Sequence, residues 1–170
     1  MRYKLLIVFL IFTPWSYASE IPNYFDACDS HPSTGQTVFR LSIARSFHPD
    51  ATFHLCERLK ADESFLRIQV TQRDGTNDES RELKLDPQTY SEIIDLYHEA
   101  VDYNVRDDAM GADGSRWCLE TSRKFTFAIA CFWTPTPEVR AEERGLIGLY
   151  NLGKTLWELA ELESEIGKVY

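Results

Sequence analysis

The sequence has few basic residues, and beyond the apolar stretch near its start it has no apolar run long enough to cross a membrane. Among its 170 residues, 18 are Lys or Arg and 27 are Asp or Glu, which gives a formal net charge of −9. This balance disfavours nucleic acid and anionic membranes as partners, because both are negatively charged. It favours a basic protein partner, or serves solubility alone.

The motifs that mark common catalytic sites are also missing. The chain has no G-x-S-x-G nucleophile elbow, P-loop, H-E-x-x-H or dinucleotide fingerprint. Acidic pairs such as Asp107-Asp108 and Glu142-Glu143 occur, but nothing in the sequence brings two of them together across a cleft. We therefore expect no catalytic residue and no cofactor, although an unfamiliar enzyme remains open as an alternative.

Candidate metal ligands are sparse, and the chain has no C-x-x-C pair. His54 and Cys56 alternate onto one face of a possible strand, but a metal site needs three or four ligands. We expect His54 to be a surface residue beside a structural cysteine. Asp113 and Glu120 fit part of a calcium-loop pattern, whose first two ligand positions here offer no side-chain oxygen. We expect no metal site.

Residues 1–18 predict a secretory signal peptide. Arg2 and Lys4 give a positive start, an apolar run of eight follows, and the small residue Ala18 stands at the cleavage site. Such a run is too short to span a bilayer, and the alternative is an uncleaved anchor. Cleavage would leave residues 19–170, a single secreted domain of 152 of the 170 residues. Its formal charge would be −11, because 16 basic residues would face 27 acidic ones.

Four cysteines lie in the predicted mature chain, and an even number in an exported protein indicates disulfides and an oxidising compartment. Four cysteines allow three pairings. We favour Cys118–Cys131 and therefore Cys28–Cys56, because the first two fall opposite each other in a predicted hairpin.

That hairpin lies in residues 111–133, the clearest β pattern of the chain. Strands are predicted at 116–121 and 125–133, with a polar break between them and a turn centred near Lys124 and Phe125. In this register Cys118 opposes Cys131, and directly opposed Cβ atoms lie close enough for a disulfide.

The same register has a consequence for the two faces of the hairpin. Glu120 shares a face with Phe127 and Ile129, whereas Trp117 and Leu119 share the other face with alanines and Phe132. Both faces are then partly apolar. Either the sheet is covered on both sides, which we expect, or the pairing slips by one residue.

The remaining chain predicts more strands and two helices. Alternating patterns indicate an antiparallel meander of four strands, at 36–45, 52–58, 65–72 and 81–85, the second of which could instead be a short helix. Asp86-Pro87 predicts the start of one helix, and Thr136-Pro137-Glu138 that of another, which runs toward Leu162. Gly145, Gly148 and Gly153 weaken this second helix, and they either allow close packing on the sheet or mark the true start of the helix. The predicted fold class is α+β: an antiparallel sheet of five or six strands, meander plus hairpin, packed with two helices and held by two disulfides.

Aromatic residues supply the candidate binding site. Trp117, Trp133 and Trp157 could line a ligand groove, although we expect core packing for at least two of them. The candidate binding residues are Trp117, Trp133 and Asp113, the last at the turn before the hairpin. Glu120 is expected to be structural, paired with a Lys or Arg or with a backbone N–H.

The segment D-G-x-x-W-x-L-E, residues 113–120, resembles a motif of uncharacterised secreted bacterial proteins. In those proteins, as here, an aromatic strand follows, then a W-x-P step at 133–135 and a C-terminal helix. The resemblance covers about a third of the chain. It implies a bacterial periplasmic protein and brings no assigned activity.

These patterns lead to one functional expectation and two alternatives. We expect a periplasmic or secreted, non-catalytic binding or interaction protein, of which an immunity-type inhibitor is one specific version. The alternatives are a small secreted hydrolytic enzyme and a structural component of the envelope. Acidic and His side chains converging in a deep cleft would favour the enzyme, and a shallow surface with exposed aromatics would favour binding.

Overall fold

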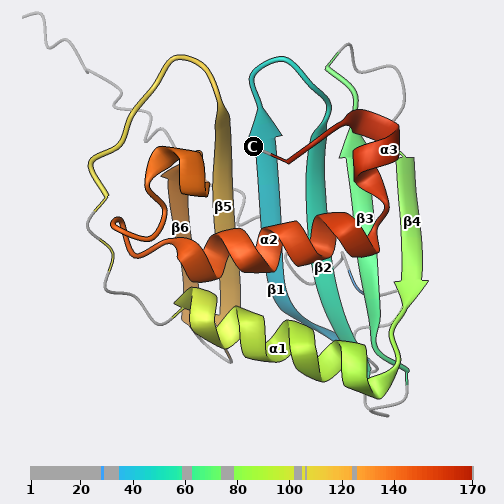
Figure 1. Ribbon diagram of the computed structural model, residues 1–170. Helices are drawn as coiled ribbons and strands as arrows, with labels where there is room; N and C mark the ends of the chain where they lie inside the picture. The colour runs from blue at the N-terminus through green and yellow to red at the C-terminus, as the bar shows by residue number, and fades with distance from the viewer. Residues whose placement is uncertain are drawn as a thin grey trace, which may run out of the picture.

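The computed structural model describes residues 28, 35–58, 63–73, 79–101, 105, 107–123 and 126–169. Six strands form one antiparallel sheet in the order β4-β3-β2-β1-β5-β6 (Figure 1). The strands are β1 (Gly35–Arg45), β2 (Asp50–Arg58), β3 (Phe65–Thr71), β4 (Glu79–Lys84), β5 (Ser115–Arg123) and β6 (Thr126–Trp133). The helices are α1 (Pro87–Val101), α2 (Ile147–Leu159) and α3 (Leu162–Ile166), preceded by the 3₁₀ turn η2 (Pro137–Val139). The predicted signal peptide and the hairpin turn at 124 and 125 lie outside the described residues.

The predicted meander is confirmed as β1 to β4, and the hairpin β5–β6 adds to the edge that β1 leaves free. Alternation explains the strands: Phe39, Leu41 and Ile43 of β1 are fully buried, whereas Arg40 and Ser42 between them are only partly buried. Residues 50–58 form a strand, which decides against the short-helix alternative.

The hairpin register is confirmed residue by residue. Cys118 pairs with Cys131, and Glu120 pairs with Ile129. Both predicted disulfides are present, Cys118–Cys131 and Cys28–Cys56, with Cα atoms 4.0 and 5.5 Å apart. Two disulfides fit an oxidising location. Within the described part of the chain, no helix combines the length and apolar character that crossing a membrane requires.

The start of α1 follows the sequence signal. One carboxylate oxygen of Asp86 accepts hydrogen bonds from the backbone N–H groups of Gln88 and Thr89, at 2.9 and 3.0 Å. Pro87 occupies the first helical position, where its missing N–H costs nothing. These contacts also lower the pKa of the Asp86 carboxyl, through the Thr89 side chain first and then the backbone.

The prediction of one continuous C-terminal helix from Thr136 toward Leu162 is wrong. Left-handed backbone at Arg140 (φ 57°), Gly145 (φ 73°) and Glu161 (φ 54°) interrupts the helical path three times. The chain forms η2 and a series of turns before α2 begins at Ile147, and α3 follows as a separate short helix.

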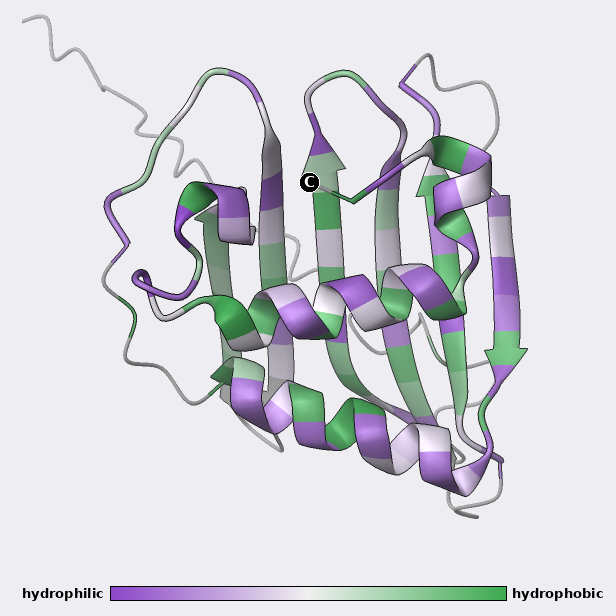
Figure 2. Cartoon of the chain, viewed as in Figure 1, coloured by the Kyte–Doolittle hydropathy of each residue, from purple (hydrophilic) through white to green (hydrophobic). Residues whose placement is uncertain are grey.

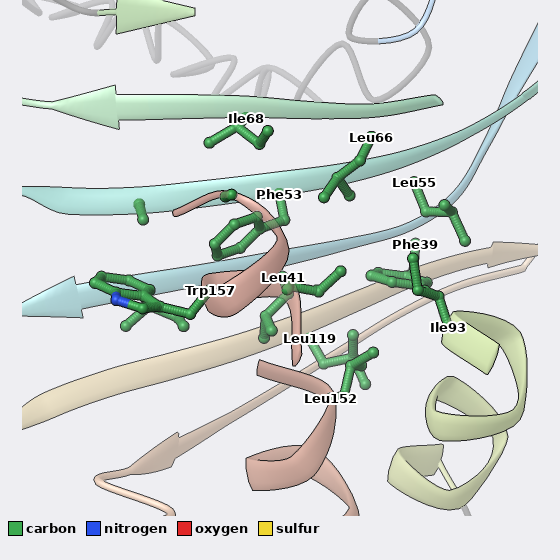
Figure 3. Close-up of a cluster of buried hydrophobic side chains, with 14 of the residues drawn as sticks. Phe39, Leu41, Phe53, Leu55, Leu66, Ile68, Ile93, Leu119, Leu152 and Trp157 are labelled. Atoms are coloured by element: carbon green, nitrogen blue, oxygen red, sulfur yellow. The ribbon is translucent and has the colours of Figure 1, made fainter. Parts of the chain in front are cut away.

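All three helices lie on one face of the sheet (Figure 1). The core lies between them and the strands, and Figure 3 shows its central side chains meeting from both layers. Along the strands hydrophobic and hydrophilic residues alternate (Figure 2). The expectation that the sheet would be covered on both faces is not met at β6, because Phe127 and Ile129 are 51% and 54% exposed.

Candidate functional site

The candidate site lies on the distal face, which we define as the sheet surface that points away from α1, α2 and α3. Strand alternation assigns to it the residues between the core positions. They include Arg40 of β1, His54 of β2 and Glu120 of β5, together with the Cys118–Cys131 disulfide. The helix-covered face is filled by the hydrophobic core.

A row of charged residues crosses the centre of the distal face. Successive strand pairings place Glu120 opposite Arg40, Arg40 opposite His54, His54 opposite Arg67 and Arg67 opposite Glu82. On each side of the central histidine there is therefore first an arginine and then a glutamate. Directly opposed side chains on neighbouring strands lie within interaction distance, so that each arginine meets a carboxylate on its outer side.

The two ends of this row differ in burial. The Arg40 guanidinium donates a hydrogen bond to Glu120 Oε1, and the Glu120 residue is only 3% exposed. Arg67 Nε donates to Glu82 Oε1 at 3.1 Å, but Glu82 is largely exposed. The prediction that Glu120 pairs with a Lys or Arg is confirmed. We expect that removal of one partner destabilises the fold more at the buried end than at the exposed end, because it leaves a buried charge without its partner.

His54 at the centre of the row is buried, at 4% exposure, so the expectation of a surface histidine is wrong. Burial lowers the pKa of its imidazole to about 4, helped by the positive charges of Arg40 and Arg67 and opposed by a hydrogen bond with Gln69. Its Nδ1 atom has no hydrogen-bond partner within the described structure. The neutral ring is therefore a poor base near pH 7, since a general base works best with a pKa near the operating pH.

A hollow of about 410 Å³ lies at one end of the distal face. Its size falls in the range of small-molecule sites. Strand pairing places Ala44, Arg116 and Trp133 in one row across β1, β5 and β6, and these three residues line it. Arg73 and Asp50 line it from the far side of the β1–β2 turn.

Close packing holds the Trp133 ring in this hollow. A Cβ atom on Gly111 would lie 2.0 Å from the indole, so only glycine permits the contact. Gly114 has φ +135°, a conformation that favours glycine, as the Asp113-Gly114 turn signal predicts. The Ser46 N–H donates to Gly114 O at 2.9 Å and joins the two loops that border the hollow.

The structure separates the three predicted binding residues. Trp133 lines the hollow, and Asp113 is exposed on the neighbouring loop but is not one of the lining residues. Trp117 is fully buried, and its indole N–H donates to Ser115 Oγ at 2.8 Å. Trp157 is buried in the core as well, so core packing holds for two of the three tryptophans.

Of the residues that line the hollow, sequence reasoning named Trp133 as a binding candidate but none of the arginines. Arg116 follows from the hairpin register, which places it opposite Trp133. Arg73 could not be found in this way, because it reaches the site from the end of β3, and its guanidinium donates to Ser46 O.

The described residues of the distal face include charged and aromatic side chains. No three His, Cys, Asp or Glu side chains gather closely enough to hold a metal ion in the part of the chain that the structure describes. The buried histidine faces arginines on both neighbouring strands, and the hollow presents arginines and an indole. Comparisons with protein-family models, curated proteins and solved structures found no match to this chain.

Proposed function

We propose that the protein is an exported, non-catalytic binding protein of the bacterial periplasm, and that it binds a protein partner through the β6 side of its distal face. The observation that carries this proposal is the exposure of Phe127 and Ile129, at 51% and 54%. They are two residues apart on an edge strand and therefore point to the same side.

The surroundings of these two side chains suit an interface. Ile129 lies opposite Glu120, which is already paired with Arg40, so an approaching partner meets an apolar centre beside a neutralised ion pair. The formal charge of −9 favours a partner of basic character, because opposite charge speeds encounter. An immunity-type inhibitor, which blocks another protein by binding it, is one form that this function could take.

Matched isoleucine substitutions test the proposal. Purified, oxidised protein is immobilised and exposed to an envelope extract of the source cell, and each retained protein is then purified and titrated by calorimetry. Ile129→Glu should weaken partner binding at least about tenfold, because a charge would be buried in the interface. Ile147→Glu is the control, since Ile147 is also exposed but belongs to α2 on the other side of the sheet.

Two results would contradict this proposal. One is a partner that the wild-type protein and the Ile129→Glu variant bind with equal affinity, while both proteins keep the circular-dichroism spectrum of the native fold. The other is turnover of a substrate by the purified chain that Ile129→Glu leaves intact, which would restore the hydrolytic alternative.

A further inference from the structure

The hollow concentrates positive charge in a chain that is acidic as a whole. Three arginines line it, Arg45, Arg73 and Arg116, whereas the net charge of the sequence is −9. Arg45 is buried, and its guanidinium already donates hydrogen bonds to the backbone oxygens of Pro49, Ile166 and Lys168.

The other two arginines differ from Arg45 in their exposure. Arg73 and Arg116 are exposed, and within the described residues neither forms an ion pair with a carboxylate. By contrast, Arg40, Arg67, Arg81 and Arg144 each contact an acidic side chain. Among the described residues, therefore, two guanidinium groups without a carboxylate partner border the same hollow.

The rest of the lining limits the kind of anion. Trp133 and Ala44 give it an apolar wall beside Arg116, and the indole is held by its contact with Gly111. Asp50 also lines the hollow, and its carboxylate accepts a hydrogen bond from the backbone N–H of Arg45 at 2.8 Å. This fixed negative charge opposes a dianion more strongly than a monoanion.

We propose that the hollow binds an aromatic monocarboxylate. The carboxylate would lie between Arg73 and Arg116, because the planar guanidinium fork matches its two oxygens. The aromatic ring would pack against Trp133. The carboxylate can belong to a free small acid or to the C-terminal residue of a peptide, which share this chemistry. The site is separate from the Phe127–Ile129 surface and does not depend on the protein partner.

Calorimetric titration with defined probes tests the site. The first pair is 3-phenylpropionate and its neutral amide, and the second is Gly-Gly-Phe with a free or an amidated C-terminus. The carboxylates should bind with a Kd on the order of 1 mM, and the amides at least about tenfold more weakly. A tighter Kd for the peptide than for the free acid would assign the site to peptide ends, and the reverse order to small acids.

Substitution and spectroscopy locate the binding. Arg116→Gln should weaken the carboxylates about tenfold, whereas Lys154→Gln, which removes the same charge from an exposed position of α2, should change nothing. The NMR signal of the Trp133 indole N–H should shift on titration.

Three outcomes would overturn the inference: equal binding of acid and amide, binding that Arg116→Gln leaves unchanged, or inorganic phosphate that competes as strongly as the aromatic acid. Each would leave the partner surface standing, because its test uses Ile129→Glu. Conversely, an Ile129→Glu variant that still binds 3-phenylpropionate normally would separate the two sites.

Discussion

His54 is the residue whose surroundings most affect its chemistry. It lies between Arg40 and Arg67 in the sheet and is almost fully buried, so protonation would add a third positive charge to a buried site. The pKa of its imidazole is therefore about 4 in the folded protein, below the usual 6.5. The unfolded chain has no such restriction, and stability becomes dependent on pH.

The sign of this dependence follows from the two pKa values. Above pH 6.5 the imidazole is neutral in both states, and its contribution does not change. As the pH falls from 6.5 to about 4, the imidazole becomes protonated in the unfolded state but stays neutral in the folded state. The free energy of unfolding therefore decreases. The loss amounts to about 3 kcal/mol across this window. Urea denaturation at a series of pH values should show it.

The substitution His54→Gln should flatten that part of the pH profile, because glutamine does not titrate. The exposed His98 on α1 provides the control, and His98→Gln should keep the wild-type slope. A wild-type slope in the His54→Gln variant would show that other groups cause the pH dependence.

Glu120 gives a second prediction at this scale. Its carboxylate is buried and paired with Arg40, so Glu120→Gln would leave the arginine beside a neutral group. We expect a loss of roughly 1–3 kcal/mol in the free energy of unfolding. Glu82→Gln is the matched control in the same row, and its exposed pair with Arg67 should cost less than about 1 kcal/mol. Equal losses in urea titrations would contradict the role assigned to burial.

At the scale of elements, the contact between α2 and the sheet depends on Gly153. A Cβ atom there would lie 2.1 Å from the indole of Trp117. That ring cannot easily move, because it is fully buried and hydrogen-bonded to Ser115. Gly153→Ala should therefore destabilise the protein by roughly 1–3 kcal/mol, although alanine is the better helix former by about 1 kcal/mol.

Thermal unfolding of this variant decides between the two effects. Lys154→Ala, at the neighbouring exposed position of the same helix, serves as the control, because it removes only an exposed pair with Glu158 and places no new atom against the sheet. A Gly153→Ala variant with a raised Tm would mean that the indole can shift at little cost.

Elements were predictable where local chemistry decides them. The alternation around Phe39 and Leu41, the Asp86-Pro87 cap and the opposed cysteines each identified an element or a register that the structure confirms. The C-terminal helix was not predictable in the same way. Two of its interruptions, at Arg140 and Glu161, are left-handed turns at residues that carry no turn signal. The third is at Gly145, a residue type that favours such backbone and that the sequence offered as a possible helix start.

At the scale of the whole molecule, the candidate site was only partly predictable. The hairpin alone assigns Glu120 to a face, but its partner Arg40 is 80 residues away in the sequence. The row through His54 combines the predicted meander order β4-β3-β2-β1 with the pairing of β5 to β1, and no local pattern fixes that pairing. For the same reason Arg73, which lines the same hollow as Trp133 only in the folded chain, could not be found.

We expect the whole chain to be exported and its first residues to be cleaved. Expressed with its own first 18 residues in a bacterium, the protein should be recovered from the periplasm and begin at Ser19 by N-terminal sequencing. Non-reducing peptide mapping should then link Cys118 to Cys131 and Cys28 to Cys56. The first bridge should contribute about 3 kcal/mol by the chain-entropy estimate, and the second slightly more because it closes a longer loop.

The control is the same chain without residues 1–18, produced in the reducing cytoplasm. It should carry free thiols and unfold at a lower urea concentration, because the unfolded state is no longer restricted by the two bridges. Oxidation of that material in vitro should restore the midpoint of the exported protein. A mature chain that still begins at Met1, or equal midpoints for the reduced and oxidised forms, would contradict the link between export and stability.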